Sequence, residues 1–191
     1  MQWKKEKEEL VKFAKKIYKK GFVSGLSGNL SLRVNEKAFL ITPKAKYYEK
    51  LKNSDLVLVD LDGNIIEGEK EPSSEKKLHL AIYRERKDIN AIIHAHSCFA
   101  CILAALECPL PIILDEQREV LGGEVKVAKY APSGSDELAH ETVRCLGQGK
   151  AVILAKHGTV ATGKSITEAY YVCELLERLS KIYLFMRLLQ R

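Results

Sequence analysis

The sequence predicts one α/β domain over residues 1–191, with a central sheet that is not purely parallel. A chain of this length is the size of one domain with a sizeable core. Apolar runs of strand length alternate with longer stretches in which apolar residues recur at helical spacing. Asp62-Gly63-Asn64 separates two strand-like runs as a hairpin turn does, and a hairpin pairs its strands antiparallel.

The N-terminal part predicts a helix followed by two strands. Residues 4–20 place apolar side chains on one helical face, and Gly21 follows where such a helix would end. The small-residue segment 24–29 leads into an alternating strand at 30–34, and a second strand covers 38–42. The exposed N–H groups of segment 24–29 would suit an anion, and a simple tight turn explains the segment equally well.

A second helix is expected after strands at 56–60 and 65–66. Ser73 and Ser74 open it, and it runs to about Lys87. Serine is favoured at helix N-caps, where free N–H groups also attract phosphate.

Glu75 stands at the head of the apolar stripe of this helix. Leu78, His79 and Ile82 lie three, four and seven positions beyond it. A carboxylate on a buried face needs a partner, which a metal ion or a substrate proton would supply. The alternative is a first-turn glutamate that complements the helix dipole while it stays in water.

The second half of the chain continues the alternation, with strands expected at 92–96, 125–128 and 151–155 and helices at 97–106, 133–146 and 166–189. Within the first of these helices, Cys98, Cys101 and Ile102 share one face. Cysteine behaves as a small hydrophobe, so we expect Cys98-x-x-Cys101 to pack in the core rather than to bind zinc or act as a redox pair. His140 is expected on the surface.

Gly158–Ser165 matches the P-loop pattern, with a strand before it and a helix after it. Too few residues follow Ser165 to build the later strands of a nucleotide-binding sheet. A strand at 159–161, a turn at Gly163 and a capping box made by Ser165 with Glu168 account for the same residues.

Composition and charge narrow the function classes. The net charge of +6 suits a phosphorylated substrate, and it also suits nucleic acid. The N-terminal lysines alternate with glutamates, which is typical of a solvated helix face, so no nucleic-acid partner is expected. No apolar run reaches the length of a membrane span, and the first residues lack the apolar segment of a secretory signal. Five cysteines, an odd number, suit a reducing compartment. We therefore expect a cytoplasmic protein without a membrane partner.

Three histidines are candidates for a metal site. His94 and His96 lie two residues apart in a predicted strand, so both point to the same side. Two imidazoles placed in this way can converge on one ion, and two half-buried histidines with ordinary hydrogen bonds are the alternative. His157 follows the buried strand at 151–155. Together with Glu75 they form a plausible Zn²⁺ set, in which a carboxylate that leaves the metal would act as acid and base.

In six short motifs the chain resembles the class II aldolase/adducin family. They occur in the same order and at similar spacing from about residue 5 to 185, which makes the set specific although each motif is short. The motifs are Gly25-x-x-Gly28-Asn29-Leu30-Ser31, Leu40-Ile41-Thr42-Pro43, Tyr48-Glu49-Lys50-Leu51, Pro72-Ser73-Ser74-Glu75, His94-Ala95-His96 and His157-Gly158.

The resemblance implies one class II aldolase/adducin domain over residues 1–191, folded as three α/β/α layers around a mixed, mostly antiparallel sheet. It implies a homotetramer with active sites at subunit interfaces. It also implies a zinc-dependent lyase that reversibly cleaves a small phosphorylated sugar, a ketose 1-phosphate such as L-fuculose 1-phosphate, to dihydroxyacetone phosphate and an aldehyde.

The same resemblance assigns roles to particular residues. It implies one Zn²⁺ per subunit, held by His94, His96, His157 and Glu75. It implies that Glu75 also carries a proton during turnover, and that the phosphate is bound by Gly28, Asn29, Ser73 and Ser74.

Three departures from the family pattern concern the substrate. Lys44-Ala45 stands where these aldolases typically have Thr-Gly, and Lys44 would either bind the phosphate or face solvent. A family tyrosine that reaches into a neighbouring site is missing from Leu114–Gln117, where Asp115 or Glu116 would have to replace it as an acid. The longer C-terminal tail that carries another tyrosine in some aldolases is also missing.

Other functions stay open at this point. Ribulose-phosphate 4-epimerases of the family carry Asp at the position of Glu75, so Glu favours an aldolase, while a dehydratase or a decarboxylase remains possible. Non-catalytic, adducin-like interaction modules lack the metal ligands. A P-loop nucleotide-binding protein is the third class.

Overall fold

A mixed sheet forms the centre of the computed structural model, which describes residues 2–190. Its strands lie in the order β4-β3-β2-β1-β5-β8-β7-β6. Every pairing among them is antiparallel except that of β6 with β7, which confirms a mixed, mostly antiparallel sheet. The strands are β1 (Asn29–Asn35), β2 (Ala38–Ile41), β3 (Val57–Asp60), β4 (Ile65–Glu67), β5 (Ala91–Ala95), β6 (Val127–Ala128), β7 (Ala151–Leu154) and β8 (Gly158–Gly163).

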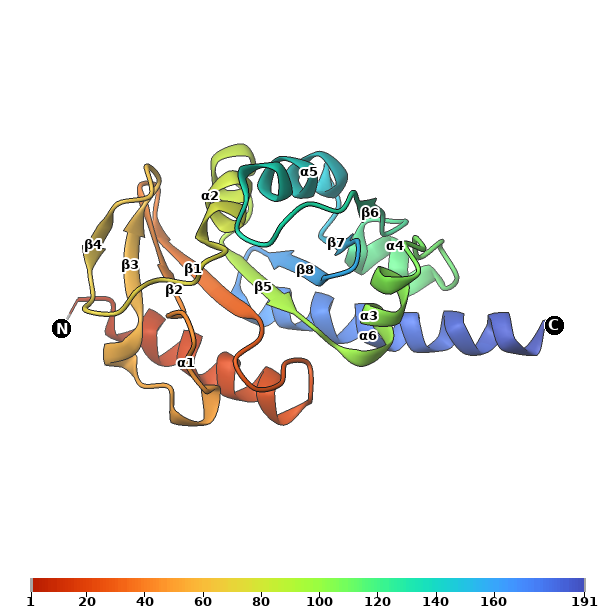
Figure 1. Cartoon of the computed structure of the whole chain (residues 1–191), viewed down its shortest axis with the longest axis horizontal. Helices are drawn as coiled ribbons and strands as arrows, with labels where there is room; N and C mark the ends of the chain where they lie inside the picture. The colour runs from red at the N-terminus through yellow and green to blue at the C-terminus, as the bar shows by residue number, and fades with distance from the viewer. Residues whose placement is uncertain (1, 191) are drawn as a thin grey trace.

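Helices cover both faces of the sheet, as Figure 1 shows. α2 and α5 lie on one face and α1, α3 and α6 on the other, which confirms three α/β/α layers. Of the helices within residues 2–190, none has the combination of length and apolarity that crossing a bilayer requires. The helices are α1 (Lys4–Lys19), α2 (Lys76–Glu85), α3 (Cys98–Ala105), α4 (Asp115–Leu121), α5 (Asp136–Leu146) and α6 (Ile166–Leu189).

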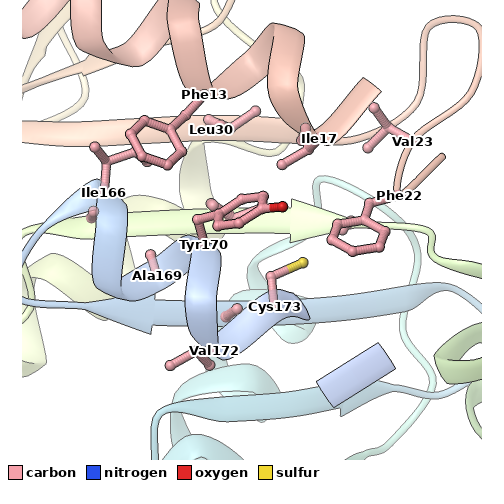
Figure 2. Packing of buried hydrophobic residues seen from close by; sticks show 14 of the residues in the cluster. Phe13, Ile17, Phe22, Val23, Leu30, Ile166, Ala169, Tyr170, Val172 and Cys173 are labelled. Carbon is pink, nitrogen blue, oxygen red and sulfur yellow. The ribbon is translucent and has the colours of Figure 1, made fainter. Parts of the chain in front are cut away.

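The two faces of the sheet hold separate hydrophobic clusters. Alternation along β2 shows why: Leu40 contributes to the cluster under α1 and α6, and Phe39 contributes to the cluster under α2 and α5. In the first cluster, Phe13 and Ile17 of α1 pack near Tyr170 of α6 (Figure 2). Burial on both faces makes the central strands rigid, and the candidate site is built on one of them.

One helix was not predicted. α4 follows a segment with two prolines and has little helical periodicity in its sequence. Its buried Gln117 donates to the carbonyl oxygens of Leu110, Pro111 and Gly123 and accepts from the N–H of Ile113. These contacts join Gln117 to residues outside the helix. Packing against the neighbouring segments therefore stabilises α4, although its local helix propensity is weak.

The prediction that Cys98-x-x-Cys101 packs in the core is wrong. α3 buries Ala100, Leu103 and Ala104, whereas Cys98 is exposed and Cys101 is only partly buried. The N–H groups of Phe99 and Ala100 donate to the carboxylate of Glu177 in α6, at 3.0 and 2.9 Å. This contact anchors the first turn of α3 so that the face with Ala100, Leu103 and Ala104 is turned toward the core, and the face with Cys98 is turned away from it.

The P-loop alternative fails on local structure. Gly158–Gly163 is the buried strand β8, paired with β5 on one side and β7 on the other, so its N–H groups do not form a phosphate-binding loop. Ser165 Oγ accepts from the N–H of Glu168 at 3.2 Å, as expected of an N-cap. The carboxylate of Glu168 instead accepts from the N–H of Lys164, so only half of the predicted capping box forms.

Candidate metal centre and adjoining cavity

His94 lies in the middle of the sheet and is fully buried. Its strand, β5, is paired with β1 and β8, and His94 lies opposite Asn29 and Val160. Nδ1 of His94 is 3.0 Å from the carbonyl oxygen of Thr159. A carbonyl oxygen only accepts, so the proton of the neutral ring is on Nδ1 and the lone pair of Nε2 is free to bind a metal.

Two further histidines come to the same point from different loops. His96 follows β5, and its backbone N–H donates to the backbone carbonyl of Phe22 at 2.8 Å. His157 lies in the tight turn from β7 to β8, where Lys156 adopts a left-handed φ of 57°. One nitrogen from each of the three histidines lies within 4.8 Å of the others, and the Nε2 atoms of His94 and His96 are 2.8 Å apart. The structure therefore brings the three predicted histidines together.

Glu75 completes this group from the start of α2. Its side chain is buried, with the residue 5 % exposed, so the alternative of a solvated first-turn glutamate is ruled out. Oε2 is 3.1 Å from Nε2 of His94, and Oε1 is 3.4 Å from Nε2 of His157. Asn29 Nδ2 donates to Oε2 at 2.8 Å, and Ser133 Oγ donates to Oε1 at 3.0 Å.

The protonation states suit a cation at the centre of the group. Burial would raise the pKa of the Glu75 carboxyl, but the neighbouring histidines and the Asn29 amide outweigh it and hold that pKa well below its usual range. Burial, together with the charges of the other two histidines, lowers the pKa of His96 to about 4. Burial also lowers the pKa of His157. Imidazole nitrogens and a carboxylate aimed at one point are the donor set that Zn²⁺ takes.

A cavity of about 300 Å³ opens beside this group. Glu75, His96 and His157 form part of its wall. The cavity is also lined by all five residues that the sequence suggested for substrate binding, namely Gly28, Asn29, Lys44, Ser73 and Ser74. The candidate metal centre and the candidate anion-binding residues therefore share one space.

Lys44 is at the exposed rim of the cavity. Its Nζ is 3.1 and 3.3 Å from the two carboxylate oxygens of Glu71, so its charge is already paired. An exposed pair of this kind contributes little to stability and exchanges readily with a competing anion. Lys44 as a substrate-binding residue stays a prediction.

Sequence reasoning missed the contact of Ser133 with Glu75. The loop before α5 delivers this serine by packing tightly against the start of α2. A Cβ added at Gly134 would lie 2.8 Å from the carbonyl oxygen of Ser74, so this approach requires glycine. Nothing in the sequence around Ser133 signals the contact.

Neither Asp115 nor Glu116 lines the cavity of its own chain. Glu116 accepts a hydrogen bond from Tyr171 at 2.5 Å and is ion-paired with Arg178, both on α6. Within one chain, Glu116 therefore joins α4 to α6. Asp115 is exposed. A role of either residue as the replacement acid stays a prediction.

Alanine at position 158 is expected to weaken metal binding. A Cβ at Gly158 would lie 2.7 Å from both the carbonyl oxygen of Ala95 and Cδ2 of His96, so the imidazole must move. We expect about a tenfold loss of Zn²⁺ affinity, measured by competition with a chromophoric chelator. Gly163→Ala is the matched control, because its Cβ would clash with the backbone N of Ala169 at 2.5 Å, far from the histidines. Equal Zn²⁺ affinity in the two variants would contradict the prediction.

Glycine at position 45 is expected to stabilise the protein. Ala45 lines the cavity and has a φ of 53°, a left-handed conformation that a Cβ disfavours. We expect Ala45→Gly to raise the free energy of unfolding by about 0.5–1 kcal/mol in urea melts. Ala105→Gly, at an exposed position of helix α3, is expected to lower it by about 1 kcal/mol. A loss of stability in Ala45→Gly would show that Ala45 is not strained.

Comparison with known proteins places this chain in a family. Residues 8–184 match the family described as Class II Aldolase and Adducin N-terminal domain. A 5-deoxy-D-ribulose 1-phosphate aldolase of Bacillus thuringiensis is 38 % identical, over 94 % of this chain and 84 % of the relative. An L-fuculose phosphate aldolase of Methanocaldococcus jannaschii is 37 % identical, over 97 % of this chain and 99 % of the relative.

The structural comparison agrees with the sequence comparison. A solved structure of an L-fuculose 1-phosphate aldolase superposes with a TM-score of 0.93 at 39 % identity, over 97 % of this chain and 87 % of the other. The chain therefore belongs to the class II aldolase and adducin family and is a class II aldolase, a carbon–carbon lyase.

Proposed function

We propose that this protein is a zinc-dependent aldolase that reversibly cleaves a ketose 1-phosphate to dihydroxyacetone phosphate and an aldehyde. L-fuculose 1-phosphate and similar sugars are the candidate substrates, supported by the names of the similar aldolases. The observation that carries the proposal is the convergence of His94, His96 and His157 on the buried carboxylate of Glu75, at the wall of a cavity.

The donor set supports one Zn²⁺ per chain, held by the three histidines and Glu75. Three imidazole nitrogens and one carboxylate match the ligand types and the number that zinc prefers. When bound, zinc supplies Lewis-acid stabilisation of the negative charge that develops on the substrate's ketone oxygen. The hydrogen bond from Nδ1 of His94 to Thr159 keeps that imidazole in the tautomer this role requires.

Glu75 is the proposed proton carrier. Cleavage leaves a carbanion next to the ketone, and its carbon must exchange a proton with a nearby acid or base. Glu75 lines the cavity and starts α2, whereas His94 is held within the sheet. Asn29 and Ser133 hold one carboxylate oxygen each, which keeps the group aimed at the cavity when it acts as a base.

The phosphate is proposed to lie between the Gly28–Asn29 segment and the start of α2. Both Ser73 and Ser74 precede this helix, whose N-terminal N–H groups favour an anion. Gly28 approaches β5 so closely that a Cβ there would lie 2.8 Å from the carbonyl oxygen of His94. The proposed phosphate-binding segment Gly28–Asn29 therefore lies directly beside β5, the strand that carries His94.

A substrate screen tests the proposal. Phosphorylated ketoses are incubated with the protein, and dihydroxyacetone phosphate is measured with a coupled dehydrogenase, with and without a chelator. We expect release from at least one ketose 1-phosphate, lost with chelator and restored by Zn²⁺. Carbon dioxide release from a 3-oxo sugar-acid phosphate, or epimerisation without cleavage, would replace the aldolase with another sugar-phosphate reaction. Tight ATP binding without metal would overturn the proposal.

We further infer a homotetramer with active sites at subunit interfaces. The support in this chain is an apolar cavity of about 530 Å³ between α3 and the end of α6, flanked by the exposed side chains of Ile102, Leu106 and Leu188. Light scattering after size exclusion should give four times the chain mass, and a monomer would contradict the inference. All five cysteines are free thiols, which supports a cytoplasmic location.

A further inference from the structure

A chain of buried polar side chains lies behind Glu75. Starting from the carboxylate, it passes through Asn29, His79 and Ser31 to Tyr83. The successive distances are 2.8, 2.5, 2.6 and 2.8 Å. These four residues are between 0 and 4 % exposed. Nothing in the proposed reaction uses His79, although a buried imidazole is costly unless both of its nitrogens are paired.

The spacing of these hydrogen-bonded side chains follows from one helix and one strand. Glu75, His79 and Tyr83 lie four residues apart along one face of α2. Asn29 and Ser31 lie two residues apart on one face of β1. The two sets interdigitate where α2 packs on the sheet, so each polar group of the helix meets one of the strand.

The chemistry of each atom sets the direction of every hydrogen bond. The Glu75 carboxylate only accepts, so Asn29 must turn its Nδ2 toward it. The Asn29 Oδ1 then faces Nε2 of His79, which must carry the proton. Nδ1 of His79 must therefore accept from the Ser31 hydroxyl.

The direction of the last hydrogen bond, between Ser31 and Tyr83, follows in the same way. Ser31 Oγ, having donated to His79, accepts from the Tyr83 hydroxyl. Burial lowers the pKa of His79 to about 3 and keeps the ring neutral, which a one-proton link requires. All four bonds point toward Glu75, and bonds aligned in one direction strengthen one another in a buried setting.

We propose that His79 is a positioning residue for Glu75, which it controls by locking the amide of Asn29; the inference rests on the proposed role of Glu75 at the metal. The amide has two orientations of similar shape. In one, Nδ2 donates to the carboxylate, and in the other, Oδ1 would repel it. The Nε2–H of His79 selects the first orientation because it can only donate to an oxygen. Asn29 also lines the cavity, so the same lock presents its donor between Glu75 and the substrate space.

A double-mutant cycle tests this assignment. Zn²⁺ is titrated against a chromophoric chelator into the full-length protein, with wild-type sequence, His79→Leu, Glu75→Ala and both changes together. We expect His79→Leu alone to weaken Zn²⁺ binding about tenfold and to lower kcat about as much. In the Glu75→Ala background, the same change should alter Zn²⁺ affinity by less than about twofold, because its effect passes through Glu75. An equal loss in both backgrounds would show that His79 only supports the fold.

Two further variants separate positioning from stability. His79→Gln retains an N–H that reaches toward Asn29, and we expect it to restore Zn²⁺ affinity and kcat to within about threefold of wild type. Tyr83→Phe is the matched control, since it removes a buried hydroxyl of the same chain and leaves the bond of Ser31 to His79 in place. It should lower the melting temperature and change Zn²⁺ affinity by less than about twofold, because the Nε2–H of His79 still selects the orientation of Asn29. Impairment of His79→Gln equal to that of His79→Leu would overturn the proposal.

Failure of the proposed function is distinguishable from failure of this inference. The Zn²⁺ titrations need no substrate, so a screen that finds no cleaved ketose phosphate leaves their outcome intact. If the wild-type protein bound no Zn²⁺, the proposed function would fail. The same cycle would then be measured by urea unfolding, where additive effects of His79→Leu and Glu75→Ala would overturn the positioning role.

Discussion

Glu75→Gln is expected to keep Zn²⁺ bound while it removes most of the turnover. Glutamine has the shape of glutamate, and its amide oxygen can still accept from the Asn29 amide, with its NH₂ facing the Ser133 hydroxyl. It cannot take up or return a proton. General acid–base catalysis typically contributes about 10²–10⁴-fold, so we expect kcat to fall at least about 100-fold. The measurement is dihydroxyacetone phosphate release alongside metal analysis of the same samples.

Glu71→Gln is the control for this experiment. Glu71 is another carboxylate near the cavity, but it is exposed at the rim and paired with Lys44. Its replacement should leave kcat within about twofold, since exposed pairs of this kind contribute little. Turnover of Glu75→Gln close to that of the wild type would remove Glu75 from the mechanism.

His96→Ala is expected to abolish both metal binding and cleavage. Zinc sites of this type use three protein nitrogens, and His96 supplies one of the three that lie within 4.8 Å of one another. Removing a ligand should cost more than the about 10–100-fold loss typical of residues that only orient one. Metal analysis of the purified variant, with kcat measured on the same preparation, checks the result.

The control for the histidine variant lies on α5. His140 is exposed and lies outside the cavity lining, so His140→Ala should retain one Zn²⁺ per chain and full activity. Full zinc content in His96→Ala would show that the three histidines do not act together as a metal site.

Much of the fold follows from local patterns. The period-two and period-3.6 spacing of apolar residues places the long helices and most strands within a few residues of their observed bounds. The failures share a cause. α4 depends on Gln117 bridging carbonyl groups of the irregular segments just before and just after the helix, and the rotation of α3 depends on Glu177 of another helix. Neither interaction leaves a periodic signal in its own segment.

The candidate site, too, could be predicted from the sequence only in part. Spacing alone places His94 and His96 on one side of a strand, and Glu75 at the head of a buried stripe. Position along α2 also puts His79 on that stripe, but its partners are chosen by the packing of α2 on β1. The contact of Ser133 with Glu75 arises from a loop more than fifty residues away, which no local pattern encodes.

The sequence by itself determined the family, the class of enzyme and the candidate site residues, because residue types at fixed spacing limit what a strand or a helix start can present. Only the tertiary structure decided how these groups act together. It brings β5, the β7–β8 turn and the start of α2 to one point, so that three lone pairs meet one carboxylate. It also aligns the buried chain from Tyr83 to Asn29, since hydrogen-bond direction depends on which atoms face each other across the packed layers.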